Sequence, residues 1–439
     1  MVFPIVGGNQ ATGDFITNSL RFDRASSAAM SISSLSGGST TKVTVSAWIK
    51  RSGLGTDQRY WANYAGSASD RLQFGWQADD KLYIQHGDSV IFKTNQVFRD
   101  VSAWYHIVIA IDSTQGSNDN RVKAYLNGSQ ITSWGTFNTL TQNTEIFANN
   151  DKIIVGERET SSLFYDGYLS HLIQVDGSQL APTQFGETND NGVWVPIEYT
   201  GSFGTNGFKL EFKQTGTSAN ASGIGADTSG NGKHFTLSNL AALDVVTDTP
   251  FNNFCTLSST DVNVGQVPTF AEGNTKFTVA SGNNHARTDA TIRPSSGKST
   301  TNGTLQVGFI SANAGRYSSN NDDYTQDNGN NSQAVGYLNN GKVKNHGTES
   351  LTGLTTFTTS DIMGVALDLD NDKFFVSKNG TFFSNGTGTQ DPPNGTNPLF
   401  SGSIITSHKS HGFNIGAKGY GDTQNVIAAN FGNPHTSIS

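Results

Sequence analysis

The sequence has a single cysteine, Cys255, so the chain cannot form an internal disulfide and must hold its fold by packing. Charged residues are scarce, at 15% of 439 residues, and the net charge is -8. Such a chain lacks the basic face that nucleic-acid binding requires, so we expect no nucleic-acid partner. No apolar run approaches the roughly 20 residues that span a bilayer, which predicts no membrane insertion. Residues 1–13 lack the basic and apolar segments of a signal peptide.

The residues that are abundant favour short strands and tight turns. Glycine occurs 49 times, and Ser, Thr and Asn supply much of the polar content, whereas helical proteins are rich in Ala, Glu, Lys and Leu. The 27 Phe and 6 Trp exclude a disordered chain, because such chains cannot bury aromatic residues. A chain of 439 residues is also too long for one hydrophobic core. We therefore predict an all-β protein with at least two domains.

The strand and turn signals predict two tandem antiparallel β-sandwich (jelly-roll) domains joined by a short β-containing connector. Residues 1–14 are interpreted as an N-terminal arm and 15–186 as the first sandwich. Residues 187–250 are interpreted as the connector and 251–439 as the second sandwich. No segment longer than about ten residues keeps a helical period.

Several segments carry specific predictions. In the first domain, the apolar run 104–111 predicts a strand buried on both faces, and Asn127-Gly128 predicts a hairpin turn. Three tryptophans, Trp48, Trp76 and Trp104, are expected in the sandwich core.

In the second domain, strands are predicted at 305–310, 362–369 and 373–377. The acid-rich segment 368–372 lacks the glycine and the distal glutamate of an EF-hand, so it is interpreted as a turn capped by Asp and Asn side chains.

Short motifs in the first domain resemble the laminin-G-like/concanavalin-A-like jelly roll. They are Trp104-Tyr105-His106-Ile107-Val108, Tyr125-Leu126-Asn127-Gly128, Gly167-Tyr168-Leu169-Ser170 and Val175-Asp176-Gly177. In the second domain, the run from Asp361 to Asp368 and the strand ending in Lys378-Asn379-Gly380 resemble the SPRY-type sandwich. The tandem as a whole is similar to structural proteins of tailed bacteriophages, which implies a virion component such as a tail fibre, tail adhesin or capsid appendage.

Candidate ligand contacts are aromatic residues in polar, turn-rich segments. Trp134, Tyr165 and Tyr324 are each expected to be able to stack on a sugar ring while nearby amides bond its hydroxyls. Aromatic residues in such segments also serve ordinary packing, and both interpretations stay open.

The resemblance to laminin-G-like folds implies a calcium ion at the sandwich rim, where the loop from Asp112 to Asn120 would supply oxygen ligands. Asp112, Asp119 and Asn120 are the candidate ligands, and a polar β-connection without metal is the alternative. The sequence has no Cys/His cluster of the kind that binds zinc, and no other cofactor is expected.

Catalysis is tested against the glycoside hydrolases of the concanavalin-A class, which need two closely placed carboxylates. Glu157 and Glu159 lie two residues apart, but no third acid follows them. We interpret this pair as a solvated strand end and expect no enzyme activity.

The leading hypothesis is a phage protein exposed on the virion surface, assembled in the host cytoplasm, that binds host-surface glycans or a neighbouring virion protein. The alternative is a purely architectural capsid decoration or adaptor subunit without a ligand, and a glycan depolymerase ranks third. We expect a homo-oligomer, because symmetric assembly strengthens weak multivalent binding.

Overall fold

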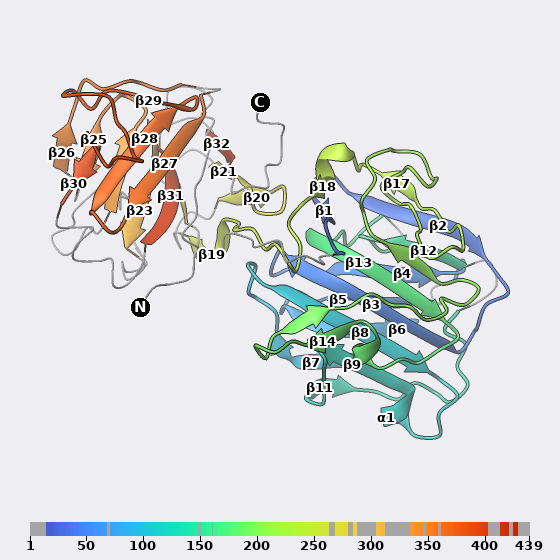
Figure 1. The fold of residues 1–439 in the computed structure, drawn as a ribbon. Coiled ribbons are helices and arrows are strands. Elements are labelled where there is room, and N and C mark those ends of the chain that lie inside the picture. Colours follow the sequence, from blue (N-terminus) through green and yellow to red (C-terminus); the bar gives the residue numbers. More distant parts are fainter. Residues whose placement is uncertain are drawn as a thin grey trace. The chain divides into compact units, whose positions relative to one another are not determined.

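The structure is a computed structural model of the chain. It describes residues 15–67, 71–147, 151–159, 161–262, 268–279, 284–287, 304–311, 334–345, 348–358, 361–402, 413–420 and 425–428. The chain divides into two compact units, Met1–Phe254 and Cys255–Ser439. Figure 1 colours the first unit from blue to yellow and most of the second in orange and red. The predicted arm at 1–14 lies outside the described residues.

The first unit contains two large sheets, called sheet A and sheet B here. Sheet A has the strand order β10-β9-β8-β3-β13-β1-β18, and β16 also pairs with β13. Its strands are β1 (Ser19–Phe22), β3 (Lys42–Arg51), β8 (Trp104–Asp112), β9 (Val122–Leu126), β10 (Ser129–Gln130), β13 (Gly167–Asp176), β16 (Phe208–Leu210) and β18 (Val245–Val246).

Sheet B has the order β11-β7-β6-β5-β4-β12-β2-β17. Its strands are β2 (Ala29–Leu35), β4 (Gln58–Tyr64), β5 (Leu72–Trp76), β6 (Lys81–His86), β7 (Ser89–Val97), β11 (Trp134–Phe137), β12 (Asp151–Val155) and β17 (Thr236–Ser238). The strands of both sheets pair antiparallel. The predicted all-β sandwich fold is confirmed.

One apolar core fills the space between sheets A and B. Because side chains alternate along a strand, Val45, Ala47 and Ile49 of β3 point into this core. Their neighbours Ser46 and Trp48 therefore point to the outer face of sheet A. The predicted hairpin also forms, with Asn127-Gly128 between β9 and β10, both at positive φ.

The outer face of sheet A is covered by residues 180–203, which contain η2 (Pro182–Gln184), β14 (Gly186–Thr188) and β15 (Trp194–Pro196). A second apolar cluster forms beneath this cover, where Val108 of β8 packs with Phe185 and Tyr199. Strand β8 is thus buried on both faces from residue 106 to 112, as its apolar run predicts.

The three tryptophans expected in the core separate in the structure. Trp76 belongs to the core cluster. Trp48 and Trp104 lie on the outer face of sheet A instead, where Trp48 stacks on His106 and Trp104 is half-buried. The prediction was wrong for these two because period-2 alternation places them opposite the core residues of β3 and β8.

The segment 187–250 supplies strands to both sheets of the first unit. Strand β16 pairs with β13, β18 pairs with β1, and β17 extends sheet B beside β2. This segment is therefore packed into the first unit.

The second unit contains a seven-stranded sheet of order β19-β22-β31-β23-β24-β25-β26, a three-stranded sheet β20-β21-β32, and a four-stranded sheet in which β30 joins β27-β28-β29. Its strands are β19 (Ser258–Val262), β20 (Thr269–Ala271), β21 (Lys276–Val279), β22 (Asn284–Arg287), β23 (Thr304–Ser311), β24 (Ala334–Leu338), β25 (Val343–Asn345), β26 (Thr348–Leu351), β27 (Met363–Asp368), β28 (Lys373–Lys378), β29 (Thr381–Phe382), β30 (Phe400–Ser401), β31 (Phe413–Tyr420) and β32 (Asn425–Ala428). The three strands predicted here correspond to β23, β27 and β28.

The acid-rich segment between β27 and β28 is a capped turn. Both carboxylate oxygens of Asp368 accept hydrogen bonds, from the backbone N–H groups of Asp370 and Asn371 at 3.1 Å and from Asn371 Nδ2 at 2.8 Å. The predicted turn is confirmed. No helix in the described part of the chain is long and apolar enough to cross a membrane.

Candidate functional site

A row of polar side chains crosses the outer face of sheet B, on the side away from the core. The strand register places Arg59 of β4 opposite Gly75 of β5, and Gly75 opposite Tyr83 of β6. Gln73 lies two residues before Gly75 and shares its face. Its neighbour Phe74 belongs to the core, which confirms the direction of Gln73.

A bulge in β4 directs the side chain of Arg59 along this row. The register shifts between Arg59 and Trp61, so two consecutive residues, Tyr60 and Trp61, both enter the core. Gly75 permits the close approach of the two strands, because a Cβ there would lie 1.9 Å from the carbonyl oxygen of Gln58.

Arg59 links the side chains of three strands. Its Nε donates to Oε1 of Gln73 at 2.7 Å, and its guanidinium carbon lies 4.2 Å from the centre of the Tyr83 ring. Burial lowers the pKa of Arg59 to about 10; Asp57 opposes this shift, and Arg158 and the other cations nearby add to it. The outer face of sheet B is thus a place where positive charge is concentrated and partly desolvated.

Polar atoms in this row are left without partners. Tyr83 is 0% exposed and Gln73 is 1% exposed. Within the part of the chain that the structure describes, neither Tyr83 Oη nor Gln73 Nε2 has a hydrogen-bond partner. A buried polar group without a partner costs about 1–3 kcal/mol, so each such atom needs an explanation.

Arg71 extends the row toward solvent. Its Nη1 lies 2.5 Å from Oε1 of Glu159, and its Nη2 lies 3.1 Å from Oδ1 of Asp88. Arg71 Nε and Glu159 Oε2 also have no hydrogen-bond partner among the described residues. The Asp88 side chain is 84% exposed, so this end of the row reaches the surface.

We call Arg59, Arg71, Gln73, Tyr83 and Glu159 the arginine cluster. Its unpartnered atoms comprise three donor groups and one carboxylate acceptor. These atoms match a ligand that offers several acceptor oxygens and at least one hydroxyl donor. Because Tyr83, Gln73 and Glu159 are buried, such a ligand would have to enter at the exposed end of the row, near Asp88.

Of the two carboxylates considered in the sequence, Glu159 belongs to this cluster, and Glu157 lies two residues before it on the chain. Burial raises the pKa of Glu157, Lys152 opposes the shift, and Glu159 adds to it. Glu159 itself is engaged by Arg71 and lies 3.8 Å from Nε of Arg158. Both carboxylates thus belong to a network of charges, and Glu157 is buried rather than solvated as the sequence predicted.

Trp134 lies on β11, the edge strand of sheet B, next to β7. Its ring is half-buried against Phe92, with centroids 4.7 Å apart. Phe137 on the same strand packs on Phe92 from another side and is 42% exposed. The edge therefore presents a partly accessible aromatic pair, and a role of Trp134 in ligand stacking stays a prediction.

Tyr165 does not fit the predicted stacking role. It is fully buried, its hydroxyl donates to the carbonyl oxygen of Lys50 at 2.9 Å, and its ring packs on Trp76. A ring enclosed on all sides cannot stack on a sugar, so Tyr165 is a core residue. Tyr324 lies outside the described residues.

The candidate calcium ligands lie at the end of β8 and on α1 (Asn118–Arg121). The carboxylate of Asp112 accepts hydrogen bonds from Thr114 Oγ1 at 2.6 Å and from Gln115 Nε2 at 2.8 Å, and pairs with Lys42. Burial raises the pKa of Asp112, but these partners outweigh burial and lower it to about 2.

Asp119 and Asn120 are exposed on α1. Among the described residues, no group of three His, Cys, Asp or Glu side chains could hold a metal ion. The oxygens of Asp112 are already engaged, and calcium binding stays a prediction.

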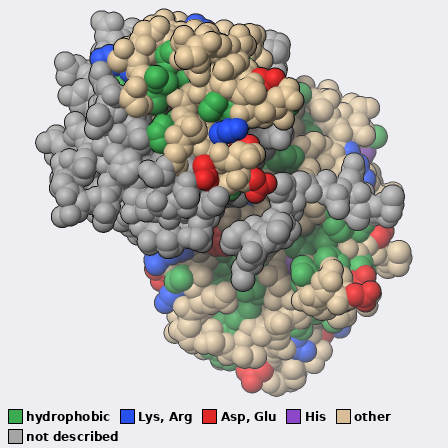
Figure 2. Space-filling view, turned by 60° about the vertical axis from the view of Figure 1, so that its left-hand side comes forward, with side chains coloured by type: hydrophobic (Ala, Val, Ile, Leu, Met, Phe, Trp, Pro, Cys, Tyr) green, Lys and Arg blue, Asp and Glu red, His purple; other side chains and the backbone are tan. Residues whose placement is uncertain are grey.

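Sequence reasoning missed the arginine cluster because no motif marks it. The available signal was alternation: Arg71 and Gln73 alternate with the core residues Leu72 and Phe74. Figure 2 shows that the visible described surface is mostly uncharged, with acidic and basic side chains in small scattered groups. The two buried arginines of the cluster, Arg59 and Arg71, differ from this mostly uncharged surface.

Comparison with known families identifies both domains. Residues 24–175 match the model of the concanavalin A-like lectin/glucanases superfamily, and residues 295–418 match the model of the SPRY domain. The chain therefore contains a concanavalin A-like domain and a SPRY domain, which confirms both resemblances. No curated protein matches the chain.

Three solved structures show a partial likeness to the chain at low identity. A heptameric SAP-like pentraxin from Limulus polyphemus is 16% identical, over 39% of this chain and 81% of that one, with a TM-score of 0.30. A candidate carbohydrate-binding protein from Bacteroides ovatus is 14% identical, over 51% of this chain and 58% of that one, with a TM-score of 0.35. The CBM40 of a Ruminococcus gnavus sialidase, bound to sialyllactose, is 12% identical, over 35% of this chain and 84% of that one, with a TM-score of 0.23.

Proposed function

We propose that the first domain binds carbohydrate at the arginine cluster on sheet B. The observation that carries this proposal is a set of buried polar atoms that have no hydrogen-bond partner among the described residues: Tyr83 Oη, Gln73 Nε2, Arg71 Nε and Glu159 Oε2. Sugar hydroxyls donate and accept hydrogen bonds at once, so one sugar ring can serve both the donors and the carboxylate. The match to a superfamily described as lectins and glucanases supports the same ligand class.

The location of the cluster also supports this function. Residues 180–203 cover the outer face of sheet A, so that face is closed to ligands. The arginine cluster extends to solvent at Asp88, where a ligand can enter. Trp134 and Phe137 pack on the core residue Phe92 and therefore lie on the opposite face of sheet B from the cluster.

We propose that the domain binds its ligand without cleaving it. A retaining or inverting glycosidase needs one carboxylate that is free to act as nucleophile or base. Glu159 is held by Arg71 and faces Arg158, which favours its role as a fixed hydrogen-bond acceptor. Release of reducing sugar that is lost in Glu157→Gln would contradict this part of the proposal.

The setting in a bacteriophage particle is a further proposal that rests on the resemblance of the tandem to phage structural proteins. In this setting the chain is exposed on the virion as a homo-oligomer, contacts other virion proteins, and attaches to host-surface glycans. Antibodies against the purified chain are expected to label intact particles. Failure to label them would contradict the proposed location on the virion and leave the glycan-binding proposal intact.

A glycan array with the purified full-length chain tests the proposed function. Arg71→Lys keeps the charge but loses the planar donor group, so we expect binding to weaken at least about tenfold, or roughly 1.4 kcal/mol. Arg24→Lys is the matched control, because Arg24 is exposed and lies outside the arginine cluster, and should bind like the parent. A folded parent chain that binds no glycan would overturn the proposal.

A further inference from the structure

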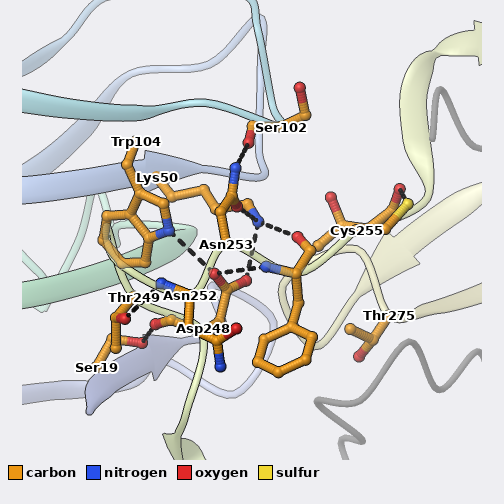
Figure 3. Close-up of polar contacts among 12 residues, drawn as sticks. Ser19, Lys50, Ser102, Trp104, Asp248, Thr249, Asn252, Asn253, Cys255 and Thr275 are labelled. Carbon is orange, nitrogen blue, oxygen red and sulfur yellow. Dashed lines mark hydrogen bonds and ion pairs between the residues drawn. The ribbon is translucent and has the colours of Figure 1, made fainter. Parts of the chain in front are cut away.

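Lys50 lies on the outer face of sheet A and ends in a buried polar site that it forms with Asp248, Asn253 and Phe254 (Figure 3). Its Nζ lies 2.8 Å from Oδ2 of Asp248, 2.8 Å from Oδ1 of Asn253 and 2.5 Å from the carbonyl oxygen of Phe254. The side chains of Lys50 and Asp248 are both 0% exposed. The amine and the carboxyl group are thus held together away from water, with the carboxamide of the exposed Asn253 against them.

The carboxylate of Asp248 is held in one orientation. Its Oδ1 accepts hydrogen bonds from Trp104 Nε1 at 3.0 Å and from the backbone N–H of Phe254 at 3.3 Å. Its other oxygen, Oδ2, therefore faces Lys50 Nζ, as Figure 3 shows. A carboxylate in this position can take a proton from the amine and pass it on.

The carboxamide of Asn253 is oriented with its oxygen inward and its nitrogen outward. Oδ1 faces Lys50 Nζ, whereas Nδ2 donates to the carbonyl oxygen of Ser102 at 2.8 Å. Because the C=O bond is about 1.23 Å long, the amide carbon lies at most about 4 Å from Nζ. This distance is close to the contact from which attack begins. Asn253 is exposed, so a group that leaves from its nitrogen can escape to solvent.

We propose that Lys50 and Asn253 join in an intramolecular amide bond, with Asp248 as the group that moves the protons. Burial favours the step, because an ammonium and a carboxylate away from water are costly, and proton transfer between them yields two neutral groups. The neutral amine then carries the lone pair that a nucleophile needs.

The bond changes balance as a transamidation. The Nζ–Cγ bond forms, the Cγ–Nδ2 bond of Asn253 breaks, and one ammonia leaves. Of the three hydrogens on the Lys50 ammonium, one stays on the new amide, one ends on Asp248, and one leaves with the ammonia. The ion pair is consumed, and no oxidant or cofactor takes part.

The bond would lock the end of the first unit. Lys50 and Asn253 are 203 residues apart in sequence, so the link closes almost the whole first unit into one covalent loop. Closing a long loop restricts the unfolded chain, as a disulfide does, and this chain has one cysteine and no such bond.

Mass spectrometry of the intact full-length chain tests the proposal. We expect a mass lower than the sequence mass by one ammonia, and a protease digest that yields a branched peptide joining Lys50 to Asn253. The measurement is repeated after prolonged incubation at growth temperature, so that a slow reaction is complete. A folded chain that keeps its full mass and yields no branched peptide would overturn the proposal and leave an ordinary buried ion pair.

Three variants separate this bond from other losses of ammonia. Asn253→Ala removes the acyl group, and Asp248→Ala removes the proton carrier, so both should keep the full mass. Asn252→Ala is the matched control: Lys50 Nζ contacts Asp248, Asn253 and Phe254 rather than the side chain of Asn252, so the ammonia should still be lost. Loss of ammonia in Asn253→Ala would place the reaction elsewhere and also overturn the proposal.

Discussion

The indole nitrogen of Trp194 lies 2.9 Å from Nδ1 of His106 and fixes the tautomer of the buried imidazole. An indole N–H can only donate, so Nδ1 accepts and the proton resides on Nε2. Nε2 then donates to Oγ of Ser46 at 2.8 Å. Trp48 stacks on the same ring, with centroids 4.7 Å apart. The neutral imidazole has all of its hydrogen bonds, and a second proton at Nδ1 would face a donor.

His106 should make the first domain sensitive to acid. Burial, with a smaller contribution from His171, lowers the pKa of His106 to about 3. The unfolded chain binds this proton below about pH 6.5, so the stability that neutral His106 contributes is present above that pH and is lost as the pH falls toward 3. Between about pH 7 and about pH 5, we expect the parent to lose about 2 kcal/mol more than His106→Gln.

Urea unfolding of the two chains at both pH values measures this difference. His171, whose pKa is also lowered to about 3 by burial, is present in both chains and cancels. Asp166 cancels in the same way, although burial raises its pKa to about 7 and gives it the opposite sign. Parallel pH profiles for parent and variant would contradict the assignment of a neutral buried His106.

Local sequence patterns predict much of this fold, but they do not predict the segment that covers sheet A. The buried run of β8 and the Asn127-Gly128 turn are local features, and the sequence predicts both. The contact of Trp194 with His106 joins residues 88 apart, and no local pattern shows that residues 180–203 return over sheet A. Trp48 is therefore buried on the outer face of sheet A, where it stacks on His106 beneath that cover.

Only the shared face of the arginine cluster could be predicted from the sequence. Arg59, Gln73 and Tyr83 lie on consecutive antiparallel strands, so alternation could have placed them on one face. The bulge that turns Arg59 across Tyr83 depends on Gly75, and its position follows from packing between strands. The prediction that Tyr165 stacks on a sugar was wrong: its polar sequence neighbours indicated an exposed ring, but the ring is fully buried.

Gly75→Ala should damage the site through the backbone. The added Cβ would lie 1.9 Å from the carbonyl oxygen of Gln58, and backbone cannot move away cheaply. We expect a loss of roughly 2–3 kcal/mol in the free energy of unfolding and weaker glycan binding. Gly116→Ala is the matched control, because no atom lies within 4 Å of its Cβ and the stability should change by less than about 1 kcal/mol. Equal stability of the two variants would contradict the close approach at Gly75.

Asp112→Asn tests whether the end of β8 has a structural or a metal-binding role. The hydrogen bonds from Thr114 and Gln115 predict that the variant loses roughly 1–3 kcal/mol of stability, to the same extent with calcium and with a chelator. Thermal unfolding under both conditions measures this. A rise of the parent Tm in calcium that Asp112→Asn abolishes would instead support the calcium site predicted at Asp112, Asp119 and Asn120.

Tyr83→Phe should move stability and binding in opposite directions. The hydroxyl of Tyr83 is buried without a hydrogen-bond partner among the described residues, so its removal should leave the free energy of unfolding unchanged or raise it by about 1 kcal/mol. The Arg59 guanidinium keeps an aromatic ring beneath it. If that hydroxyl bonds a sugar, however, the variant should bind glycan at least about fivefold more weakly.

Tyr105→Phe is the matched control for this pair of measurements, because the Tyr105 hydroxyl already donates to the carbonyl oxygen of Asp100 at 3.3 Å. It should leave glycan binding unchanged and lower stability slightly. A Tyr83→Phe variant that loses stability would show that an internal water serves the hydroxyl, since such waters are costly to remove. If that variant also bound glycan like the parent, the ligand would have to contact the domain elsewhere, and the edge residues Trp134 and Phe137 would be the next to substitute.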